Sequence, residues 1–506
     1  MQELYDKILA GEDLRENLIE LKKCLKAEEN RTAFREICAD TYDVFTQCLA
    51  DADPKVRKTA ADILGEMEAQ EALEELMRAW RAEETLFIRE DYVKALAALD
   101  CEAYLDEFHA RLAALRESEA PETERKHARA EAAALQALLL DKEGIKKHKF
   151  TGYERANEVV LTTLPAFRGE LLDALPFQKA KCPGGIAATV IDMQLVLECR
   201  YWQEMLFVVH ANPLGSKPEE IAAALAASDL MELLLENHRG EAPFYFRVGV
   251  TGALGRPEKS HLAWQAGQAI QEAFGDRLIN SPSHYEVEVR LTVDREGHIT
   301  PYLKLYTIPD HRFRYRRAHV AASMRPNVAA GIVGLARPYF FDHAQVLDPF
   351  CGVGTLLIER EFAGGVRSAY GIDTFGEAIE KARGNTQIAD LPIHYINRDF
   401  FDFTHDYLFD EILTDLPANF EDRAEADAFY GRFLKKAEEV LAPDGRIFCY
   451  TTETRLLKKH LRLNGQFRLL REFPILERGR SAFLILERRE AAGSVGPEDA
   501  QEQDEA

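Results

Sequence analysis

Apolar residues in the first part of the chain recur at intervals of three and four, and Leu, Ala, Glu and Lys dominate residues 5–140. This spacing predicts a succession of amphipathic helices. The segment 51–65 carries a capping acid, a first-turn proline and an apolar stripe, formed by Asp53, Pro54, Val56, Ala60, Ile63 and Leu64. The same phase returns near Ile88 and, more weakly, from His127. Such spacings are typical of arrays of helical pairs, so we expect residues 1–145 to form an all-α repeat domain.

The pattern changes to strands mixed with helices between residues 150 and 310. Alternating apolar residues predict strands at 158–165, 244–250, 285–293 and 302–306. A helix capped by Ser260 is expected to run to Phe274, between the second and third of these strands. Strands and helices in this order predict an α+β domain.

Four short apolar runs in the last third of the chain each close on an acidic residue. The acids are Asp348, Asp373, Asp399 and Asp415, and helix-length segments separate them. In a parallel sheet the carboxyl ends of the strands lie at one edge, where ligands bind. We therefore expect residues 346–489 to form a doubly wound α/β domain with its ligand site among these acids. The alternative is that each acid merely caps a turn.

The first of these runs leads into a Gly-rich turn within VLDPFCGVGTLLIE, residues 346–359. Gly352 and Gly354 allow a tight turn and a close approach of the backbone to a ligand, and the helix that follows presents free N–H groups. Asp373 stands where a carboxylate can hold ribose hydroxyls, and Asp399 is placed to accept from an adenine amino group. A lone Gly-x-Gly also marks ordinary turns. The spacing is not the G-x-G-x-x-G of nicotinamide-binding proteins.

The motifs DPFCGVGT, GID, NRDF and TDLPANF resemble those of S-adenosylmethionine-dependent methyltransferases that modify exocyclic amino groups, most closely the THUMP-containing RNA guanine-N2 methyltransferases. The resemblance extends over residues 150–489. It implies a class I, Rossmann-like methyltransferase domain at 346–489 and a ferredoxin-like and THUMP-like RNA-binding region at 150–310. The preceding repeats resemble a HEAT-like array. The resemblance further implies S-adenosyl-L-methionine as cofactor, held by Asp348, Pro349, Phe350, Gly352, Gly354, Thr355, Asp373, Asp399 and Asp415.

The run TDLPANF stands where this family carries the motif that binds the target base. By resemblance, Asp415 and the Pro417 carbonyl accept hydrogen bonds from the amino group, and an aromatic residue stacks on the base. Ala418 occupies the aromatic position here. Phe420 or Tyr430 could supply the ring; alternatively the base is held differently, the substrate is not guanine, or activity is degraded. The candidate catalytic residues are Asp415, Pro417 and Phe420.

A basic strip, HRFRYRR at residues 311–317, precedes the catalytic domain. Its arginines alternate with aromatic residues, which supplies phosphate contacts and stacking faces together. We expect RNA contacts from Arg312, Arg314, Arg316 and Arg317; the alternative is an ordinary strand with one basic face. The strip opens a linker, residues 311–345, whose helix from about residue 326 packs over the cofactor pocket by resemblance.

The formal net charge of −23 argues, at face value, against a nucleic-acid partner. However, roughly −13 lies in residues 1–140 and roughly −6 in residues 490–506, so the middle of the chain is close to neutral. The acidity of the helical array favours a protein partner there, or purely structural capping, over RNA. Residues 490–506 are rich in acid, Gly and Pro without apolar periodicity, so we expect them to be disordered.

The eight cysteines are scattered without a C-x-x-C pair, so no metal site is predicted. No apolar run reaches the roughly 18 residues needed to span a bilayer, and the first residues lack a basic, apolar signal. We therefore expect a cytoplasmic protein without membrane contact.

These observations together predict an S-adenosylmethionine-dependent RNA methyltransferase, with N2 of a guanine in tRNA as its target. One alternative is a catalytically weakened adaptor that binds RNA and cofactor. Another is a methyltransferase acting on rRNA, DNA or protein. The sequence does not identify the modified nucleotide, the partner of the helical array or the oligomeric state.

Overall fold

The computed structural model describes residues 1–39, 41–117, 121–145, 147–321, 323–475 and 481–489. Two compact units make up the chain. The first comprises residues 1–147 with the short segments 244–247 and 278–286, and the second comprises residues 148–243, 248–277 and 287 onward. The predicted disorder of residues 490–506 lies outside the described residues.

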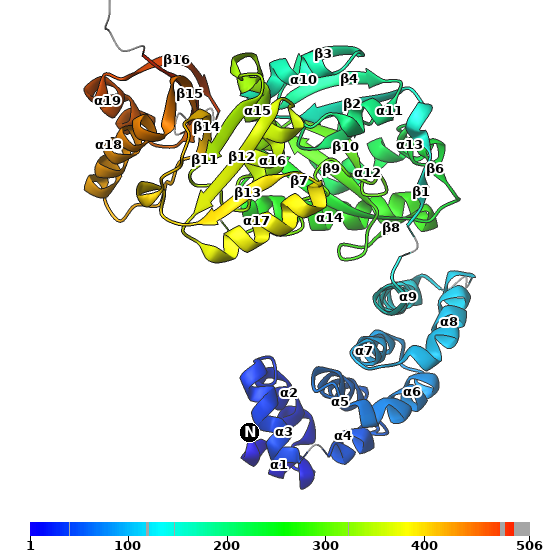
Figure 1. The fold of residues 1–506 in the computed structure, drawn as a ribbon. Helices are drawn as coiled ribbons and strands as arrows, with labels where there is room; N and C mark the ends of the chain where they lie inside the picture. The colour runs from blue at the N-terminus through cyan, green and yellow to red at the C-terminus, as the bar shows by residue number, and fades with distance from the viewer. Residues whose placement is uncertain (40, 118–120, 146, 322, 476–480, 490–506) are drawn as a thin grey trace, which may run out of the picture. The chain divides into compact units, whose positions relative to one another are not determined.

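Helices dominate the first unit, as the periodicity predicts (Figure 1). They are α1 (Gln2–Leu9), α2 (Leu14–Cys24), α3 (Glu28–Cys38), α4 (Asp43–Cys48), α5 (Pro54–Glu66), α6 (Leu73–Ala82), α7 (Leu86–Ala97), α8 (Leu105–Glu117) and α9 (Glu122–Glu143). Helices α2, α5, α7 and α9 pack against one another in succession, and α4, α6 and α8 each pack against the helix that follows. Stacked pairs of this kind bury one continuous apolar core.

Helix α5 shows how the sequence specifies this stacking. The Asp53 carboxylate accepts from the N–H of Lys55 at 2.9 Å, which caps the helix as predicted. A Cβ atom on Gly65 would lie 2.7 Å from Cα of Ala95, so this glycine lets α5 and α7 approach closely. The buried Arg89 guanidinium donates to Glu131 at 2.8 Å and ties α7 to α9.

An eight-stranded sheet forms the central part of the chain. Its strands are β2 (Asn157–Thr162), β3 (Gln178–Cys182), β4 (Gly185–Val190), β5 (Met205–Val208), β7 (Phe244–Gly252), β8 (Leu278–Asn280), β9 (Val287–Val293) and β10 (Ile299–Leu305), in the order β3-β4-β2-β5-β10-β9-β7-β8. Strands β1 (Lys149–Phe150) and β6 (His238–Arg239) pair separately. The accompanying helices are α10 (Arg168–Ala174), α11 (Met193–Glu198), α12 (Pro218–Ala226), α13 (Leu230–Asn237) and α14 (Arg256–Phe274). The region is α+β, as expected.

The start of α14 corrects one sequence prediction. The helix begins four residues before Ser260, and its cap is formed where the N–H of Gly255 donates to Glu258 at 2.7 Å. The Ser260 hydroxyl instead donates to the carbonyl of Arg256 within the helix. The prediction that Ser260 caps the helix was wrong because a Gly-Arg-Pro start with Glu at the third position supplies a cap earlier.

A seven-stranded sheet carries the third part of the chain (Figure 1). Its strands are β11 (Ala344–Asp348), β12 (Val366–Asp373), β13 (Ile393–Asn397), β14 (Phe409–Asp415), β15 (Leu441–Thr451), β16 (Phe467–Pro474) and β17 (Ala482–Arg488), in the order β13-β12-β11-β14-β15-β17-β16. The first five strands are parallel, and β17 and β16 close the sheet as an antiparallel pair. The helices are α15 (Pro326–Ala336), α16 (Thr355–Phe362), α17 (Gly376–Ala389), α18 (Arg423–Val440) and α19 (Thr454–Asn464). This is the predicted doubly wound α/β fold.

The basic strip and the residues after it run along α17, antiparallel to that helix. We call residues 311–321 and 323–324 the ascending segment. Its N–H groups at Arg317 and Ala318 donate to Asn385 at 3.1 Å, and the carbonyl of His319 accepts from Lys381 at 3.2 Å. The segment therefore connects the carboxyl-terminal end of α17 with its amino-terminal end, and α15 follows it.

One buried carboxylate fixes the ascending segment to the central region. Glu359 of α16 accepts from the Tyr315 hydroxyl at 2.6 Å and from Arg200 at 2.7 and 2.8 Å. The Arg200 guanidinium lies over the rings of Phe313 and Phe362, with centroids at 4.6 and 4.9 Å.

In the part of the chain that the structure describes, no helix is long and apolar enough to cross a membrane.

Candidate active site

A cavity of about 560 Å³ opens at the carboxyl edge of the seven-stranded sheet. The turn between β11 and α16, the end of β12, the run after β14 and the ascending segment all contribute to its wall. From the predicted set, the lining includes Asp348, Phe350, Gly352, Thr355, Asp373, Asp415 and Pro417. Four runs that are distant in sequence thus meet at one edge, as the parallel topology requires.

Asp348 ends β11 and is 1% exposed. One of its carboxylate oxygens accepts from the Thr414 hydroxyl at 2.7 Å and from the N–H of Phe350 at 3.1 Å. Burial raises the pKa of this carboxyl to about 8, although both hydrogen bonds favour its ionised form. Asp348 is therefore protonated more readily than a solvent-exposed aspartate.

Asp373 ties the Gly-rich turn to β12. Its two carboxylate oxygens accept from the N–H groups of Gly352 and Phe375, at 2.9 and 2.8 Å. Each oxygen can accept a further hydrogen bond and Asp373 lines the cavity, which suits the predicted role with ribose hydroxyls.

The two glycines of the turn serve different purposes. Gly354 has φ +80°, and a Cβ there would lie 2.2 Å from the hydroxyl oxygen of Tyr395. Gly352 has φ +52°, and a Cβ there would meet nothing within 4 Å. Gly354 is thus required for packing inside the domain, whereas Gly352 leaves its space to the cavity.

Asp415 ends β14 and faces the cavity with a carboxylate that accepts no hydrogen bond from any described residue. Burial raises its pKa to about 7. Pro417, Ala418 and Asn419 continue the wall beside it. An unpaired, half-desolvated carboxylate next to exposed loop residues is an arrangement that can accept hydrogen bonds from a second ligand.

Neither aromatic residue that could replace the ring at position 418 lies in the cavity wall. Tyr430 is fully buried, and its hydroxyl lies 2.6 Å from that of Thr451. Phe420 packs against the rings of Phe429 and Tyr430, with centroids at 5.2 and 6.3 Å. Phe420 therefore belongs to an aromatic cluster behind the wall, and its predicted catalytic role stays a prediction.

Three other predicted cofactor residues also lie outside the wall. Pro349 and Gly354 shape the turn without lining the cavity. Asp399 is exposed, and its carboxylate accepts from the N–H of Phe401 at 2.9 Å, which caps the short helix η7 (Phe400–Asp402). Its predicted contact with adenine stays a prediction.

Sequence reasoning missed part of the wall. Val320, Ser323 and Met324 of the ascending segment line the cavity, as do Phe375 and Ala378 at the start of α17. Residues 318–321 and 323–324 of the segment have no periodicity and no glycine motif, so their only signal was their place directly after the basic strip. The resemblance implied that the following helix covers the pocket. Instead the residues before α15 do so.

The four arginines of the basic strip have different environments. Arg312 is buried: it pairs with Asp310 at 2.7 Å, donates to the carbonyls of Cys199 and Trp202, and lies over the Trp202 ring. Four of its five N–H donors are therefore used inside the protein. The predicted RNA contact from Arg312 stays a prediction. Arg316 is half-buried, and burial lowers its pKa. Arg314 and Arg317 are exposed.

The cavity suits a nucleoside-bearing cofactor on two structural grounds. The Thr355 hydroxyl, at the first residue of α16, is buried and has no hydrogen-bond partner among the described residues. It lines the cavity beside the free N–H groups of the helix start, where an anionic or polar group binds. The open space at Gly352 provides the close backbone approach that such a ligand needs.

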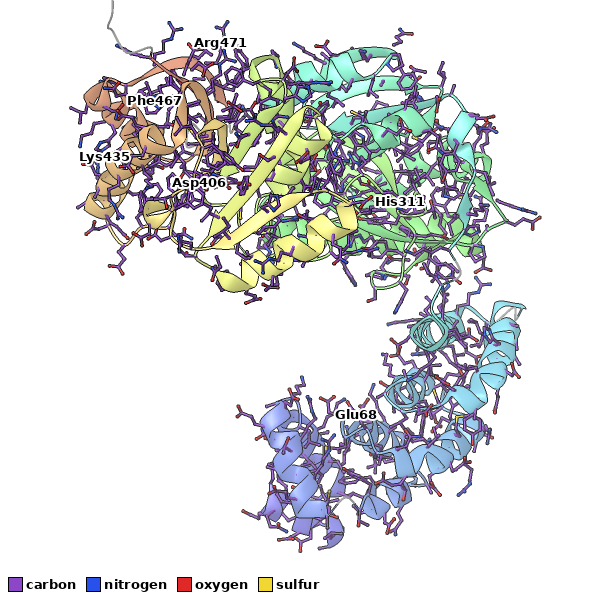
Figure 2. The ribbon with its side chains drawn as sticks, in the orientation of Figure 1. Glu68, His311, Asp406, Lys435, Phe467 and Arg471 are labelled. Carbon is purple, nitrogen blue, oxygen red and sulfur yellow. The ribbon has the colours of Figure 1, made fainter. Side chains whose placement is uncertain are left out.

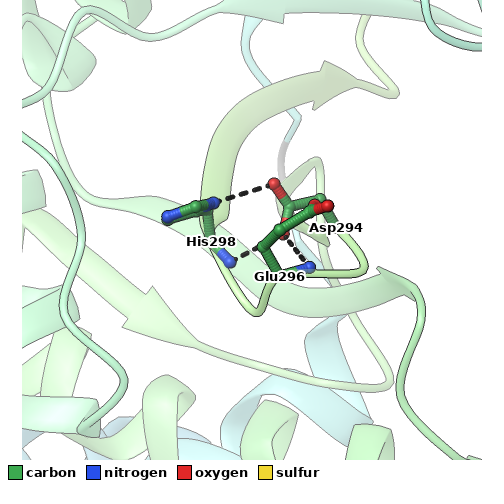
Figure 3. A group of neighbouring side chains, drawn as sticks. All are labelled: Asp294, Glu296 and His298. Carbon is green, nitrogen blue, oxygen red and sulfur yellow. Dashed lines mark hydrogen bonds and ion pairs between the residues drawn. The ribbon is translucent and has the colours of Figure 1, made fainter.

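A second polar cluster lies in the turn between β9 and β10 (Figure 3). Asp294, Glu296 and His298 bring one potential ligand atom each within 4.8 Å of one another, and all three are exposed. The Asp294 carboxylate accepts from the N–H groups of Glu296 and His298 at 2.9 and 2.8 Å. Closure of the hairpin turn explains this cluster, so we assign no metal to it.

Comparison with known proteins agrees with the fold. The UPF0020 family model, described as an RMKL-like methyltransferase domain, matches residues 314–476, and the HEAT repeat model matches residues 42–138. A ribosomal RNA large subunit methyltransferase K/L from Shewanella woodyi is 28% identical over 176 residues, which is 34% of this chain and 24% of that protein. A tRNA (guanine(10)-N2)-dimethyltransferase from Methanothermobacter thermautotrophicus is 32% identical over 155 residues, 28% of this chain and 44% of that protein.

Two solved structures share the fold. TrmN from Thermus thermophilus has a TM-score of 0.51 at 21% identity and covers 66% of this chain and 99% of its own. SMU.472, a putative methyltransferase complexed with SAH, has a TM-score of 0.50 at 16% identity and covers 67% of this chain and 99% of its own. This chain spans about a quarter of the length of the first curated relatives it matches.

These matches confirm several predictions at the level of the domain. The chain carries an S-adenosylmethionine-dependent methyltransferase domain with the predicted α/β fold, and HEAT repeats precede it. Neither family model covers residues 150–310, so the ferredoxin-like and THUMP-like assignment of that region stays a prediction.

Proposed function

We propose that the protein is an S-adenosylmethionine-dependent RNA methyltransferase that modifies N2 of a guanine in tRNA. The observation that carries the proposal is the cavity in which the unpaired Asp415 carboxylate faces the Gly-rich turn after Asp348. The first group can hold an amino group, and the second shapes a nucleoside site.

The proposed chemistry depends on position rather than on a covalent intermediate. S-adenosylmethionine would supply an electrophilic methyl group, with Thr355, Gly352 and Asp373 holding it. Asp415, once ionised, accepts a hydrogen bond from the target amino group, and the carbonyl of Pro417 accepts the second. Both bonds would orient the nitrogen lone pair toward the methyl donor, and such orientation supplies a large part of the rate enhancement in group transfer. As the N–C bond forms, the S–C bond of the cofactor would break to leave S-adenosylhomocysteine, and the proton lost by the nitrogen would pass to the Asp415 carboxylate.

RNA as substrate class is supported by the names of the relatives, which act on ribosomal RNA and on tRNA. The exposed Arg314 and Arg317 on the ascending segment, which leads into the cavity, add a local basic surface despite the acidic chain. The acidic surplus lies largely in the HEAT repeats, which on this proposal bind a protein partner rather than RNA.

The test is transfer of labelled methyl groups to total RNA, followed by nucleoside mass spectrometry. We expect N2-methylguanosine in tRNA from the intact protein, and a loss of at least about a hundredfold in kcat for Asp415→Ala, since the amine loses its acceptor. The exposed Asp444→Ala is the matched control and should keep full activity. Full activity of Asp415→Ala would refute the assignment, and nuclease-resistant label would point to a protein substrate.

A second candidate function is an RNA- and cofactor-binding adaptor without activity. Ala418 favours it, because the nearby rings of Phe420 and Tyr430 are engaged elsewhere and the wall offers the base no ring at this position. Binding of S-adenosylhomocysteine together with no methyl transfer to RNA from cells that lack the protein would support this candidate.

A further inference from the structure

A second cavity, of about 370 Å³, lies at the opposite end of α16 and α17 from the candidate active site. The first residues of the ascending segment, the carboxyl-terminal residues of both helices and the end of α11 form its wall. The side chains that give it its character are Arg314, His311, Phe362, Ile388, Arg200 and Glu198. His311 is labelled in Figure 2, where the ascending segment begins.

The wall combines apolar surface with polar side chains that make no hydrogen bond to the described residues. Phe362 and Ile388 are each 46% exposed, so both present apolar surface at the cavity. Arg314 and His311 are exposed, and their side chains make no hydrogen bond or ion pair among the described residues. Arg200, in contrast, is held by Glu359 and stacks on the Phe362 ring, which keeps that ring in place.

We infer that this cavity binds one nucleotide of single-stranded RNA, with the base against Phe362 and the phosphate at Arg314. A base needs a flat aromatic surface and a phosphate needs a cation, and each nucleotide of an RNA strand presents the two groups together. Phe362 offers the ring, Arg314 offers five donors, and His311 adds a further donor at the rim. The inference rests on the proposed RNA substrate class, but it assigns a separate site from the one that receives the target base.

The ascending segment supplies the connection between the two sites. Its beginning lines the nucleotide cavity with Ile388 of α17, and its end lines the active-site cavity with Ala378 of the same helix. Ten residues of α-helix separate the two positions, which corresponds to about 15 Å. An RNA strand that follows the exposed Arg317 between them would place its target base a few nucleotides away from the anchored one.

The test measures anisotropy of a fluorescent single-stranded RNA oligomer titrated with the full-length protein. We expect Arg314→Glu and Phe362→Leu each to weaken binding about tenfold or more, because one phosphate contact or one stacking surface is lost. Phe362→Tyr keeps a ring and should bind normally. Glu198→Gln removes a carboxylate from the wall and should tighten binding. Lys435→Glu, an exposed charge reversal on α18, is the matched control and should behave like the unchanged protein.

The readouts separate this inference from the proposed function. Binding of S-adenosylhomocysteine should be unchanged in all variants, which also shows that they are folded. If methyl transfer to RNA is detected, Arg314→Glu should raise KM for RNA and leave kcat unchanged. If no transfer is detected but the binding pattern holds, the inference stands and the enzymatic proposal falls. Normal RNA binding by both Arg314→Glu and Phe362→Leu would overturn the inference, as would equal displacement of the RNA by polyglutamate.

Discussion

Two carboxyl groups of opposite character share the active-site cavity. Asp348 is fully buried and already accepts from Thr414 and Phe350, whereas Asp415 is unpaired and reaches the cavity. Burial raises the pKa of both, to about 8 and about 7. The first is therefore suited to respond to a cation bound beside it, and the second to accept from a neutral amino group.

Methyl transfer should depend on the ionisation of Asp415. Below pH 7 this carboxyl is protonated and loses the negative charge that strengthens its hydrogen bond from the amine, so kcat/KM should fall about tenfold per pH unit on the acid side and level off above pH 7. Initial rates across this range check the expectation. Asp415→Asn should give a low rate that does not vary with pH, and a variant profile parallel to that of the unchanged protein would contradict the assignment.

The same pKa has a consequence for stability. Because the folded state holds the proton more tightly than an unfolded Asp, which titrates near 4, the folded protein should lose stability as pH rises from about 4 to about 7. Asp415→Asn lacks this titration. Urea unfolding at several pH values should therefore show a smaller loss of unfolding free energy for the variant between pH 4 and pH 7. The same pH dependence of the unfolding free energy in both proteins would argue against a raised pKa.

Restoring an aromatic residue at position 418 should improve binding of the target base. Ala418 is exposed at the wall of the cavity, so Ala418→Tyr adds a ring without displacing packed side chains. Stacking on an extruded base contributes about 1–3 kcal/mol, so KM for RNA should fall by about tenfold. Ala418→Leu, which adds bulk without a ring, is the control. An equal gain from both variants would show that stacking is not what this site lacks.

Single residues were predictable where a motif tied them to a strand end. Asp348, Gly352, Asp373 and Asp415 all lie at the predicted edge, because parallel strands deliver their last residues to one place. The buried environment of Arg312 was not predictable. Alternation in sequence cannot distinguish an arginine that meets solvent from one that stacks on Trp202, distant in sequence, and pairs with Asp310.

At the scale of elements, the turn between β11 and α16 contains one glycine that packing requires, Gly354, and one that the ligand space requires, Gly352. Gly354→Ala places a Cβ against Tyr395 and forces a left-handed conformation on a non-glycine residue. Gly352→Ala shares the conformational cost but meets only open space. Both substitutions sit in one turn, so they form a matched pair.

We expect Gly354→Ala to destabilise the methyltransferase unit by about 2–4 kcal/mol and Gly352→Ala by about 1–2 kcal/mol, the difference being the steric clash. Gly352→Ala should nevertheless lose most of its affinity for S-adenosylhomocysteine, because its methyl group occupies ligand space. Denaturant unfolding and calorimetric titration check the two effects. A stable Gly352→Ala variant with normal affinity would place the ligand elsewhere.

The elements themselves were largely predictable, because each periodic pattern is read locally. Helices α5 and α7 and strands β11 and β14 appear where their patterns placed them. The ascending segment was not predictable as part of the site, since its position depends on Asn385, Lys381 and Glu359, which are distant in sequence and carry no signal that they act together.

At the scale of the whole molecule, the HEAT repeats and the methyltransferase sheet have separate apolar cores. The core of the HEAT repeats is built within residues 5–139, and the methyltransferase sheet has its own clusters around β11 and β14. A ligand of the active-site cavity contacts only the second unit. Ligand binding should therefore stabilise the methyltransferase part of the chain and leave the stability of the HEAT repeats unchanged.

Differential scanning calorimetry should therefore show two unfolding transitions, one for the HEAT repeats and one for the methyltransferase part. S-adenosylhomocysteine at a hundred times its Kd stabilises its unit by about 2.7 kcal/mol and should shift only one transition upward. Asp373→Ala, which loosens the Gly-rich turn, should abolish the shift and leave the other transition in place. A ligand-induced shift of both transitions by the same amount would show that the units unfold together.

The antiparallel course of the ascending segment along α17 has a consequence for substrate choice. Helix α17 has a fixed length, so it sets the distance between the inferred nucleotide cavity at one end and the active-site cavity at the other. On the proposed function and the inferred nucleotide site, the protein would select its target by its distance from a bound neighbouring nucleotide rather than by recognising the surrounding sequence. Lengthening α17 and the ascending segment by one helical turn would then move the modified position along the RNA instead of abolishing modification.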